Sequence, residues 1–232
     1  MKKECIILAG GLGTRLQNVV ANLPKCMANI AGKTFLHYLL KYLESYQFEH
    51  IVLSLGYKHE VVKEWIKAQN LQCKISYMVE TEPLGTGGAI KFATQALDGN
   101  ITLVINGDTL FRVDLAKFYD SHNKSATNLS MALKPMKNFE RYGNVEINEK
   151  LEITQFREKT FCQNGLINGG IYLLNKEIFI EWPKKKFSFE NDFMPGYIKN
   201  NAVQAYIEDA YFLDIGIPED YEKAQTEFIQ FA

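Results

Sequence analysis

The sequence lacks the features that would assign it to several large classes of protein. No apolar run approaches the length of about 20 residues that crosses a bilayer, because the first such run, Cys5 to Ala9, ends at a glycine. The formal net charge is -1, so no basic field draws the chain to nucleic acid or to an anionic membrane. We therefore expect neither a nucleic acid nor a membrane among its partners.

We expect neither disulfide-forming cysteine pairs nor a secretory leader. The charged start of the chain is followed by an apolar stretch too short for a signal peptide. The cysteines form no C-x-x-C motif and have no histidine spacing typical of zinc; they are Cys5, Cys26, Cys73 and Cys162. This scatter predicts reduced thiols in a cytoplasmic protein.

What the sequence does contain is a regular alternation of segments in its first half. Strand-like apolar runs lie at residues 5–9, 50–57, 74–79 and 101–107, and segments with helical spacing lie between them at 34–46, 59–69 and 85–97. Strands that alternate with helices predict an α/β fold with a mostly parallel, Rossmann-like sheet covered on both faces, which makes three layers.

The pattern changes after about residue 125. Short strand-like segments follow at 128–135, 144–148, 152–159 and 167–175, and helical segments at 190–200 and 218–230. No low-complexity linker separates the halves, so we expect one domain over residues 1–232, with a nucleotide-binding half to about 125 and a second half from about 126. In such sheets ligands bind beyond the carboxyl ends of the strands.

A glycine-rich loop, "LAGGLGTRL", follows the first predicted strand. It is either a tight turn or a cradle whose backbone N–H groups face a phosphate. Leu16 stands where the dinucleotide fingerprint requires its third glycine, and the later "GKT" has Met27 where a P-loop requires its first. Arg15 can bind phosphate through two hydrogen bonds, and Lys25, held behind a proline, offers a second cation.

The stretch "ETEPLGTGGA" follows the third predicted strand. Its glycines would let the backbone approach a planar ligand, and the start of the next helix favours anions. Glu80 or Glu82 could accept two hydrogen bonds from the edge of a base, an arrangement that favours guanine. The alternative is a helix start with capping acids.

Two aspartates end apolar runs that lie far apart in the chain. Asp108 follows Leu103 to Ile105 in "NGDT", and Asp214 stands in "FLDIG". A buried carboxylate without a partner is costly, and a divalent cation would remove that cost. The two could therefore share one Mg²⁺, although either alone could be a turn former.

Polar residues also follow strands of the second half. "FREK" supplies Glu158 and Lys159, and "INGGIY" supplies Asn168 and Gly169. These are either ordinary hairpin residues or a shelf for hydroxyl groups, with a lysine for a second phosphate.

Together these motifs resemble the sugar-1-phosphate nucleotidyltransferase family. The resemblance rests on five stretches in the right order along the chain: G-x-G-T-R at 11–15, "PKCM" at 24–27, "PLGTGGA" at 83–89, "NGD" at 106–108 and D-x-G at 214–216. Cys26 stands where the family has a second proline.

The resemblance implies a role for each matching residue. It implies catalytic Arg15 and Lys25, metal ligands Asp108 and Asp214 with Mg²⁺, a nucleotide site of Leu8, Ala9, Gly10, Gly11, Gly13, Thr14, Glu80, Gly85 and Asn106, and a sugar-phosphate site of Gly143, Glu158, Lys159, Asn168 and Gly169.

Within the family, residues 8–35 and 80–90 are most similar to the guanylyltransferases. This implies GTP and a sugar 1-phosphate as substrates, the expected sugar phosphate being D-glycero-α-D-manno-heptose 1-phosphate, with a product used for surface polysaccharide. Mannose 1-phosphate, or uridylyl or cytidylyl transfer, are the alternatives, and a homodimer is compatible with all of them.

Two other classes of protein compete with this interpretation. A glycosyltransferase of similar architecture usually carries an Asp-x-Asp motif, but residue 106 is asparagine. A regulatory subunit that binds a nucleotide sugar without turnover would be expected to lose Arg15, Lys25 or the paired aspartates, and all four are present.

Overall fold

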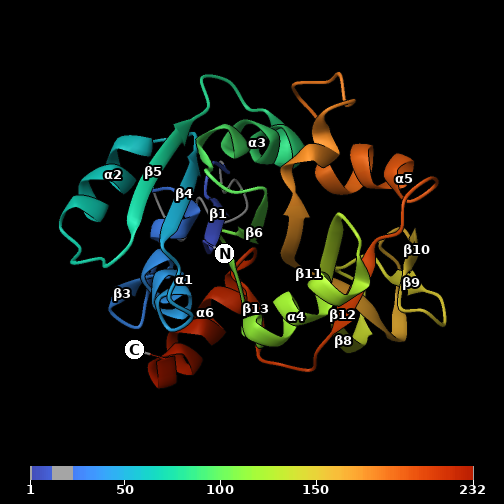
Figure 1. Cartoon of the computed structure of the whole chain (residues 1–232). Helices are drawn as coiled ribbons and strands as arrows, with labels where there is room; N and C mark the ends of the chain where they lie inside the picture. Colours follow the sequence, from blue (N-terminus) through green and yellow to red (C-terminus); the bar gives the residue numbers. More distant parts are fainter. Residues whose placement is uncertain (1, 12–22, 232) are drawn as a thin grey trace.

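A computed structural model describes residues 2–11 and 23–231 and contains one large sheet at its centre (Figure 1). The sheet has seven strands, in the order β12 (Gln204–Ile207), β8 (Leu129–Phe139), β11 (Cys162–Asn175), β6 (Ile101–Asn106), β1 (Glu4–Leu8), β4 (His50–Leu55) and β5 (Lys74–Val79). Only β11 runs antiparallel to its neighbours in this sheet. Strands from both sides of residue 125 therefore share one mostly parallel sheet.

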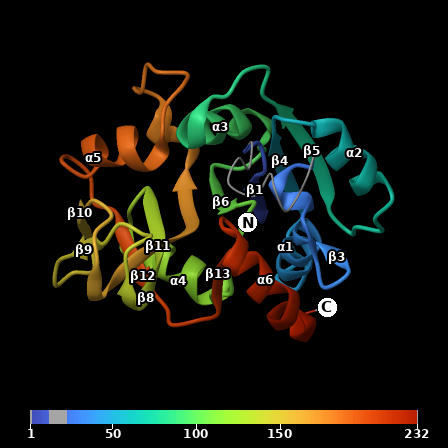
Figure 2. The ribbon, with the colours of Figure 1, turned by 180° about the vertical axis from the view of Figure 1, so that it is seen from behind.

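Helices cover both faces of this sheet (Figures 1 and 2). One apolar core contains side chains of α1 (Phe35–Glu44), α2 (His59–Lys67), α4 (Leu115–Ser125) and α6 (Pro218–Glu227). The core on the opposite face contains side chains of α3 (Gly85–Ala93), η4 (Lys176–Phe179), η5 (Phe189–Phe193) and α5 (Met194–Tyr197), with the short η3 (Thr94–Ala96) after α3. The expected three-layer α/β fold is confirmed.

The sequence explains this division of the core. Along β1, Cys5 and Ile7 contact the α1 side while Ile6 contacts the α3 side, as the alternation of a strand requires. Helix α1 begins where the hydroxyl of Thr34 accepts a hydrogen bond from the backbone N–H of His37 at 3.2 Å.

Three small ribbons flank the central sheet. They pair β2 (Asn29–Ile30) with β3 (Lys33–Thr34), β7 (Thr109–Phe111) with β13 (Phe212–Asp214), and β9 (Val145–Ile147) with β10 (Ile153–Phe156); η2 (Lys25–Met27) and η6 (Phe228–Phe231) complete the elements. The "GKT" stretch belongs to the first ribbon, where Ala31 and Gly32 make the turn with φ of 48° and 83°. It is therefore a hairpin, consistent with its rejection as a P-loop.

Most predicted segments match observed helices and strands, but β8 and β11 are longer than expected and β12 was not predicted. Strand β11 begins at Cys162, before the predicted start at residue 167. Strand β8 continues to Phe139, past Pro135, which pairs with Leu166 of β11. Strand β12 pairs only with residues 130–133, so β8 is an edge at Pro135, where the missing N–H does not interrupt a ladder.

The structure bears on two features considered in the sequence, the cysteines and the apolar segments. All four cysteines are free thiols. None of the helices within residues 2–11 and 23–231 combines the length and apolar character that a bilayer crossing needs.

Candidate functional site

The carboxyl ends of β1 and β6 lie side by side and bring two of the predicted motifs together. Leu8 pairs with Asn106, and the backbone N–H of Gly107 donates to the carbonyl of Leu8 at 2.9 Å. A Cβ on Gly107 would lie 2.5 Å from that carbonyl oxygen, so this turn requires glycine. The close approach fixes where Asp108 leaves the sheet.

Lys25 lies between the two predicted metal ligands. Its Nζ is 2.6 Å from Oδ2 of Asp108 and 3.8 Å from Oδ1 of Asp214. The carboxylates meet because Asp214 ends β13 opposite Thr109 of β7, and because the N–H of Ile215 donates to the carbonyl of Asp108 at 3.0 Å. Three residues that are far apart in the sequence therefore form one charged cluster.

Asp214 is the more buried of the two carboxylates in this cluster. Burial raises its pKa, and the neighbouring Asp108 raises it further, while Lys25 and Arg141 oppose both effects. Its Oδ1 is buried and accepts no hydrogen bond from any described residue. Carboxylate oxygens are the ligands that Mg²⁺ prefers, so this oxygen, which accepts no hydrogen bond, and the adjacent Asp108 fit a divalent cation.

Cys26 stands beside this cluster, where the family has a proline. Burial first, and then the nearby Asp108 carboxylate, raise the pKa of its thiol to about 12. The thiol therefore stays protonated and packs in the core rather than reacting.

A polar pocket of about 200 Å³ lies next to the charged cluster. The predicted residues that line it are Asn106, Lys159, Asn168, Gly169 and Asp214, and the remaining lining residues are Thr109, Arg141, Tyr142, Gly170 and Phe212. Asn106, which was expected to bind nucleotide, thus shares a pocket with the residues expected to bind the sugar phosphate. The pocket joins groups from β6, β11 and β13 at one end of the sheet.

Other predicted residues lie outside this pocket. Glu158 is exposed and is not among the lining residues. Gly143 follows Tyr142 and lets two segments approach, because a Cβ there would lie 2.6 Å from the carbonyl oxygen of Arg157. Gly13, Thr14 and Arg15 fall outside the residues that the structure describes.

Glu80 lies against the first described residues of the glycine loop. A Cβ on Gly10 would be 2.9 Å from Oε1 of Glu80, which also accepts a hydrogen bond from the Ser54 hydroxyl at 3.3 Å. Its Oε2 accepts the backbone N–H of Leu84 at 2.9 Å. The carboxylate is therefore held in place beside the loop, and each oxygen retains a lone pair for a ligand.

The glycines at the start of α3 serve a different purpose from the one their pattern suggested. A Cβ on Gly85 would lie 2.5 Å from the carbonyl oxygen of Phe187, one on Gly87 2.2 Å from the Phe187 ring, and one on Gly88 2.3 Å from the carbonyl oxygen of Lys185. The N–H groups of Gly87 and Gly88 donate to the Phe187 carbonyl at 3.0 and 3.2 Å. The absence of side chains at these glycines lets the chain's own segment 185–187 approach closely, in the space where a planar ligand was expected. The amides of Gly87 and Gly88, which were expected to bind an anion, donate to the carbonyl of Phe187 instead.

Sequence reasoning missed Arg141, Tyr142 and Phe212. Arg141 forms ion pairs with Asp220 and, at 3.7 Å, with Asp214. Arg141 and Tyr142 follow the carboxyl end of β8, a position where ligand-binding residues are expected. They were missed because the strand was expected to end at Pro135. No comparable signal marks Phe212, whose place depends on the short ribbon of β7 and β13.

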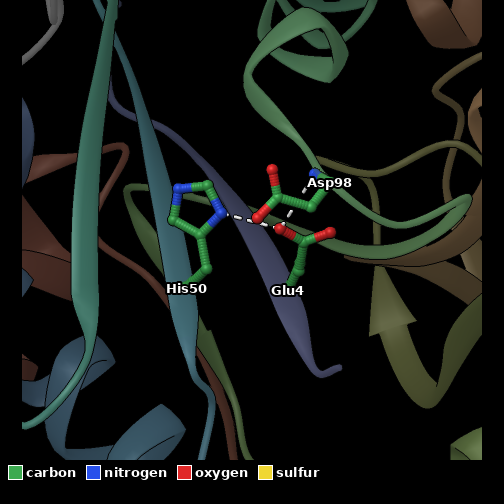
Figure 3. Close-up of side chains that lie close together, drawn as sticks. All are labelled: Glu4, His50 and Asp98. Atoms are coloured by element: carbon green, nitrogen blue, oxygen red, sulfur yellow. Dashed lines mark hydrogen bonds and ion pairs between the residues drawn. The ribbon is translucent and has the colours of Figure 1, made fainter. Parts of the chain in front are cut away.

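A second group of ionisable side chains lies at the opposite, amino-terminal edge of the sheet (Figure 3). Ligand atoms of Glu4, His50 and Asp98 lie within 4.8 Å of one another. The Glu4 carboxylate accepts from Nδ1 of His50 at 2.7 Å and from the N–H groups of Asp98 and Gly99, while Nε2 of His50 lies 2.8 Å from the Ser76 hydroxyl. Because these polar atoms already have partners in the chain, we assign the group a structural role.

These features define an α/β protein whose sheet presents a glycine loop, a lysine and two carboxylates beside a polar pocket. Such a combination of cations and carboxylates is typical of enzymes that transfer phosphoryl or nucleotidyl groups. The nucleotidyl transferase family matches residues 4–230, and the chain belongs to that family.

Individual relatives resemble the chain over nearly their whole length. It is 48% identical to D-glycero-alpha-D-manno-heptose 1-phosphate guanylyltransferase of Aneurinibacillus thermoaerophilus, covering 97% of each chain. It is 47% identical to the protein of the same name from Campylobacter jejuni, covering 94% of this chain and 96% of the relative.

A solved structure shares the fold. HddC of Yersinia pseudotuberculosis superposes with a TM-score of 0.89 at 41% identity, covering 97% of this chain and 99% of HddC. HddC has also been solved in complex with GMP-PN, with a TM-score of 0.88 to this chain.

Proposed function

We propose that this chain transfers GMP from GTP to D-glycero-α-D-manno-heptose 1-phosphate and releases pyrophosphate. The observation that carries the proposal is the meeting of Lys25, Asp108 and Asp214 at the edge of a pocket that also contains Lys159. The similarity to two guanylyltransferases and to HddC supports the choice of nucleotide and sugar.

The proposed chemistry is an in-line displacement. A phosphate oxygen of the sugar 1-phosphate attacks the α-phosphorus of GTP, and the bond to the pyrophosphate leaving group breaks. The protein contributes mainly position and charge, because the transferred group carries its own reactivity. Lys25 neutralises the α-phosphate, and Arg15 neutralises the departing pyrophosphate.

Asp108 and Asp214 would hold Mg²⁺. When bound, the ion supplies positive charge to the phosphate oxygens. In its absence the Lys25 ammonium stabilises both carboxylates, so the same lysine serves the cluster and the α-phosphate.

The remaining residues orient the two substrates. In the proposal Lys159 binds the phosphate of the sugar, and Gly143, Glu158, Asn168 and Gly169 bind its hydroxyl groups. The nucleotide is held by Leu8 to Gly11, Gly13, Thr14 and Asn106, and Glu80 accepts N–H groups of the guanine base.

Pyrophosphate release tests the proposal. With Mg²⁺ present, the purified protein is supplied with GTP, UTP, CTP or dTTP in combination with heptose, mannose or glucose 1-phosphate. Release confined to GTP and the manno-configured heptose is the expected result. Release with another pair would overturn the assignment of the substrates but keep the reaction.

Two negative outcomes separate the competing classes. A glycosyltransferase would consume a nucleotide sugar without releasing pyrophosphate. A regulatory subunit would bind GDP-heptose and release nothing from any pair, which would overturn the proposal.

The proposal also includes the setting of the reaction. The four free cysteines are suited to the reducing cytoplasm. The product is a sugar with an activated anomeric carbon, as glycosyl transfer to a surface polysaccharide requires. A homodimer stays a prediction.

A further inference from the structure

A chain of hydrogen bonds runs from the polar pocket to a glutamate that sequence analysis did not single out. Asn168, which lines the pocket, donates from Nδ2 to the hydroxyl oxygen of Tyr172 at 2.7 Å. That hydroxyl donates to Oε1 of Glu190 at 2.9 Å. The chain therefore links strand β11 to the segment η5 that covers it.

The second oxygen of the same carboxylate is bound to the start of α3. Oε2 of Glu190 accepts the hydroxyl of Thr86 at 2.7 Å and that of Ser188 at 3.3 Å. Thr86 in turn accepts the backbone N–H of Phe189 at 2.8 Å. One side chain thus joins helix α3 to strand β11, which carries the predicted sugar site.

The directions of these hydrogen bonds are fixed by chemistry. Tyr172 is fully buried, and burial together with the Glu190 carboxylate raises the pKa of its hydroxyl well above the usual range. The hydroxyl therefore keeps its proton, donates it to Glu190 and can only accept from Asn168. Because the N–H of Gly170 donates to Oδ1 of Asn168 at 2.9 Å, the amide has a single orientation that satisfies both neighbours.

We propose that Glu190 is a positioning residue for the sugar-phosphate site, acting through Tyr172 to fix which way the Asn168 amide faces. In this orientation one N–H of Asn168 is bound to Tyr172 and the other is left for a substrate oxygen. The inference rests on the proposed function for its kinetic part, while the orientation of the amide can be measured without any turnover.

Glu190→Gln tests the proposal with almost no change of shape. The substituted amide supplies one oxygen where Tyr172 and Thr86 each need an acceptor. If its NH₂ faces Tyr172, the tyrosine hydroxyl must donate to Asn168, whose amide then turns its own NH₂ toward the N–H of Gly170. We expect the KM for the sugar 1-phosphate to rise about 5- to 20-fold while the KM for GTP changes by less than about twofold.

Three further variants separate positioning from general damage. Tyr172→Phe removes the middle of the relay and should raise the same KM, and the double variant with Glu190→Gln should be no worse than the poorer single variant. Glu177→Gln, the same substitution at an exposed site, should change neither KM. Additive effects in the double variant, or equal losses for both substrates, would overturn the proposal.

An NMR measurement keeps the inference independent of activity. The side-chain NH₂ signals of Asn168 are assigned by their loss in Asn168→Asp. They should shift in Glu190→Gln and in Tyr172→Phe, and stay in place in Glu177→Gln. Unmoved signals in both relay variants would refute the proposal, even if the wild-type protein transferred a different nucleotide or none.

Discussion

Replacing Gly87 with alanine should destabilise the protein without weakening its binding of GTP. The added Cβ would lie 2.2, 2.4 and 3.0 Å from three atoms of the Phe187 ring. That ring cannot move freely, because the rings of Phe179, Trp182 and Phe193 lie 6.1, 5.3 and 6.3 Å from it, centroid to centroid. Overpacking of this kind costs about 1–3 kcal/mol, and the better helix propensity of alanine offsets up to about 1 kcal/mol.

The expected net loss lowers the melting temperature by about 2–8 °C for a chain of this size. Thermal unfolding is measured for Gly87→Ala beside Gly196→Ala, a control in which the new Cβ has no atom within 4 Å. The control should keep or slightly raise the melting temperature. If Gly87→Ala unfolded normally but bound GTP more weakly, the glycine would serve the ligand, and our account of the 185–187 segment would be wrong.

Three other predictions concern single side chains. Asp108→Asn should lower kcat about 10²- to 10³-fold while the protein still binds GTP, and near-normal pyrophosphate release would refute its role as metal ligand. Lys159→Met should raise the KM for the sugar 1-phosphate roughly 10- to 100-fold, and an equal rise for GTP would place the lysine elsewhere. Burial raises the pKa of Glu4, but the hydrogen bond from His50 and the backbone N–H groups of Gly99 and Asp98 outweigh burial and hold this pKa below its usual value. Ionised Glu4 thus stabilises the fold above its unfolded pKa, and that stability is lost as pH falls through the folded pKa. Glu4→Gln should therefore lower the melting temperature by about 3–12 °C at pH 7 and by less in acid, and a constant difference down to pH 3 would contradict this.

Much of the fold was predictable because its elements repeat a strong local pattern. The apolar strand at residues 101–107 and the helix at 34–46 are visible from periodicity alone. The rule that ligands bind beyond strand ends then led to Lys159 and Asn168, and the family resemblance added Asn106. The structure brings all three into one pocket, although Asn168 lies within β11.

The parts that sequence reasoning missed depend on contacts between distant residues. Strands β7 and β13 have three residues each, too few to show a period, yet their pairing places Phe212 and Asp214 in the site. The glycines of α3 indicated a close approach by another group, but the sequence did not reveal that this group is Phe187.

The two edges of the central sheet carry opposite kinds of polar group. At the amino-terminal ends of the strands both oxygens of Glu4 accept hydrogen bonds, from His50 and from the backbone of residues 98–99, whereas at the carboxyl ends Oδ1 of Asp214 accepts none from the described residues. Glu4 begins strand β1, and Asp214 lies beyond its other end, on β13. Laboratory selection for heat resistance should therefore accumulate replacements of Asp214 and its neighbours and abolish turnover, unless activity is selected at the same time. Substitutions that raise stability at the cost of activity are thus expected at the carboxyl ends of the strands, and not around Glu4 at their amino-terminal ends.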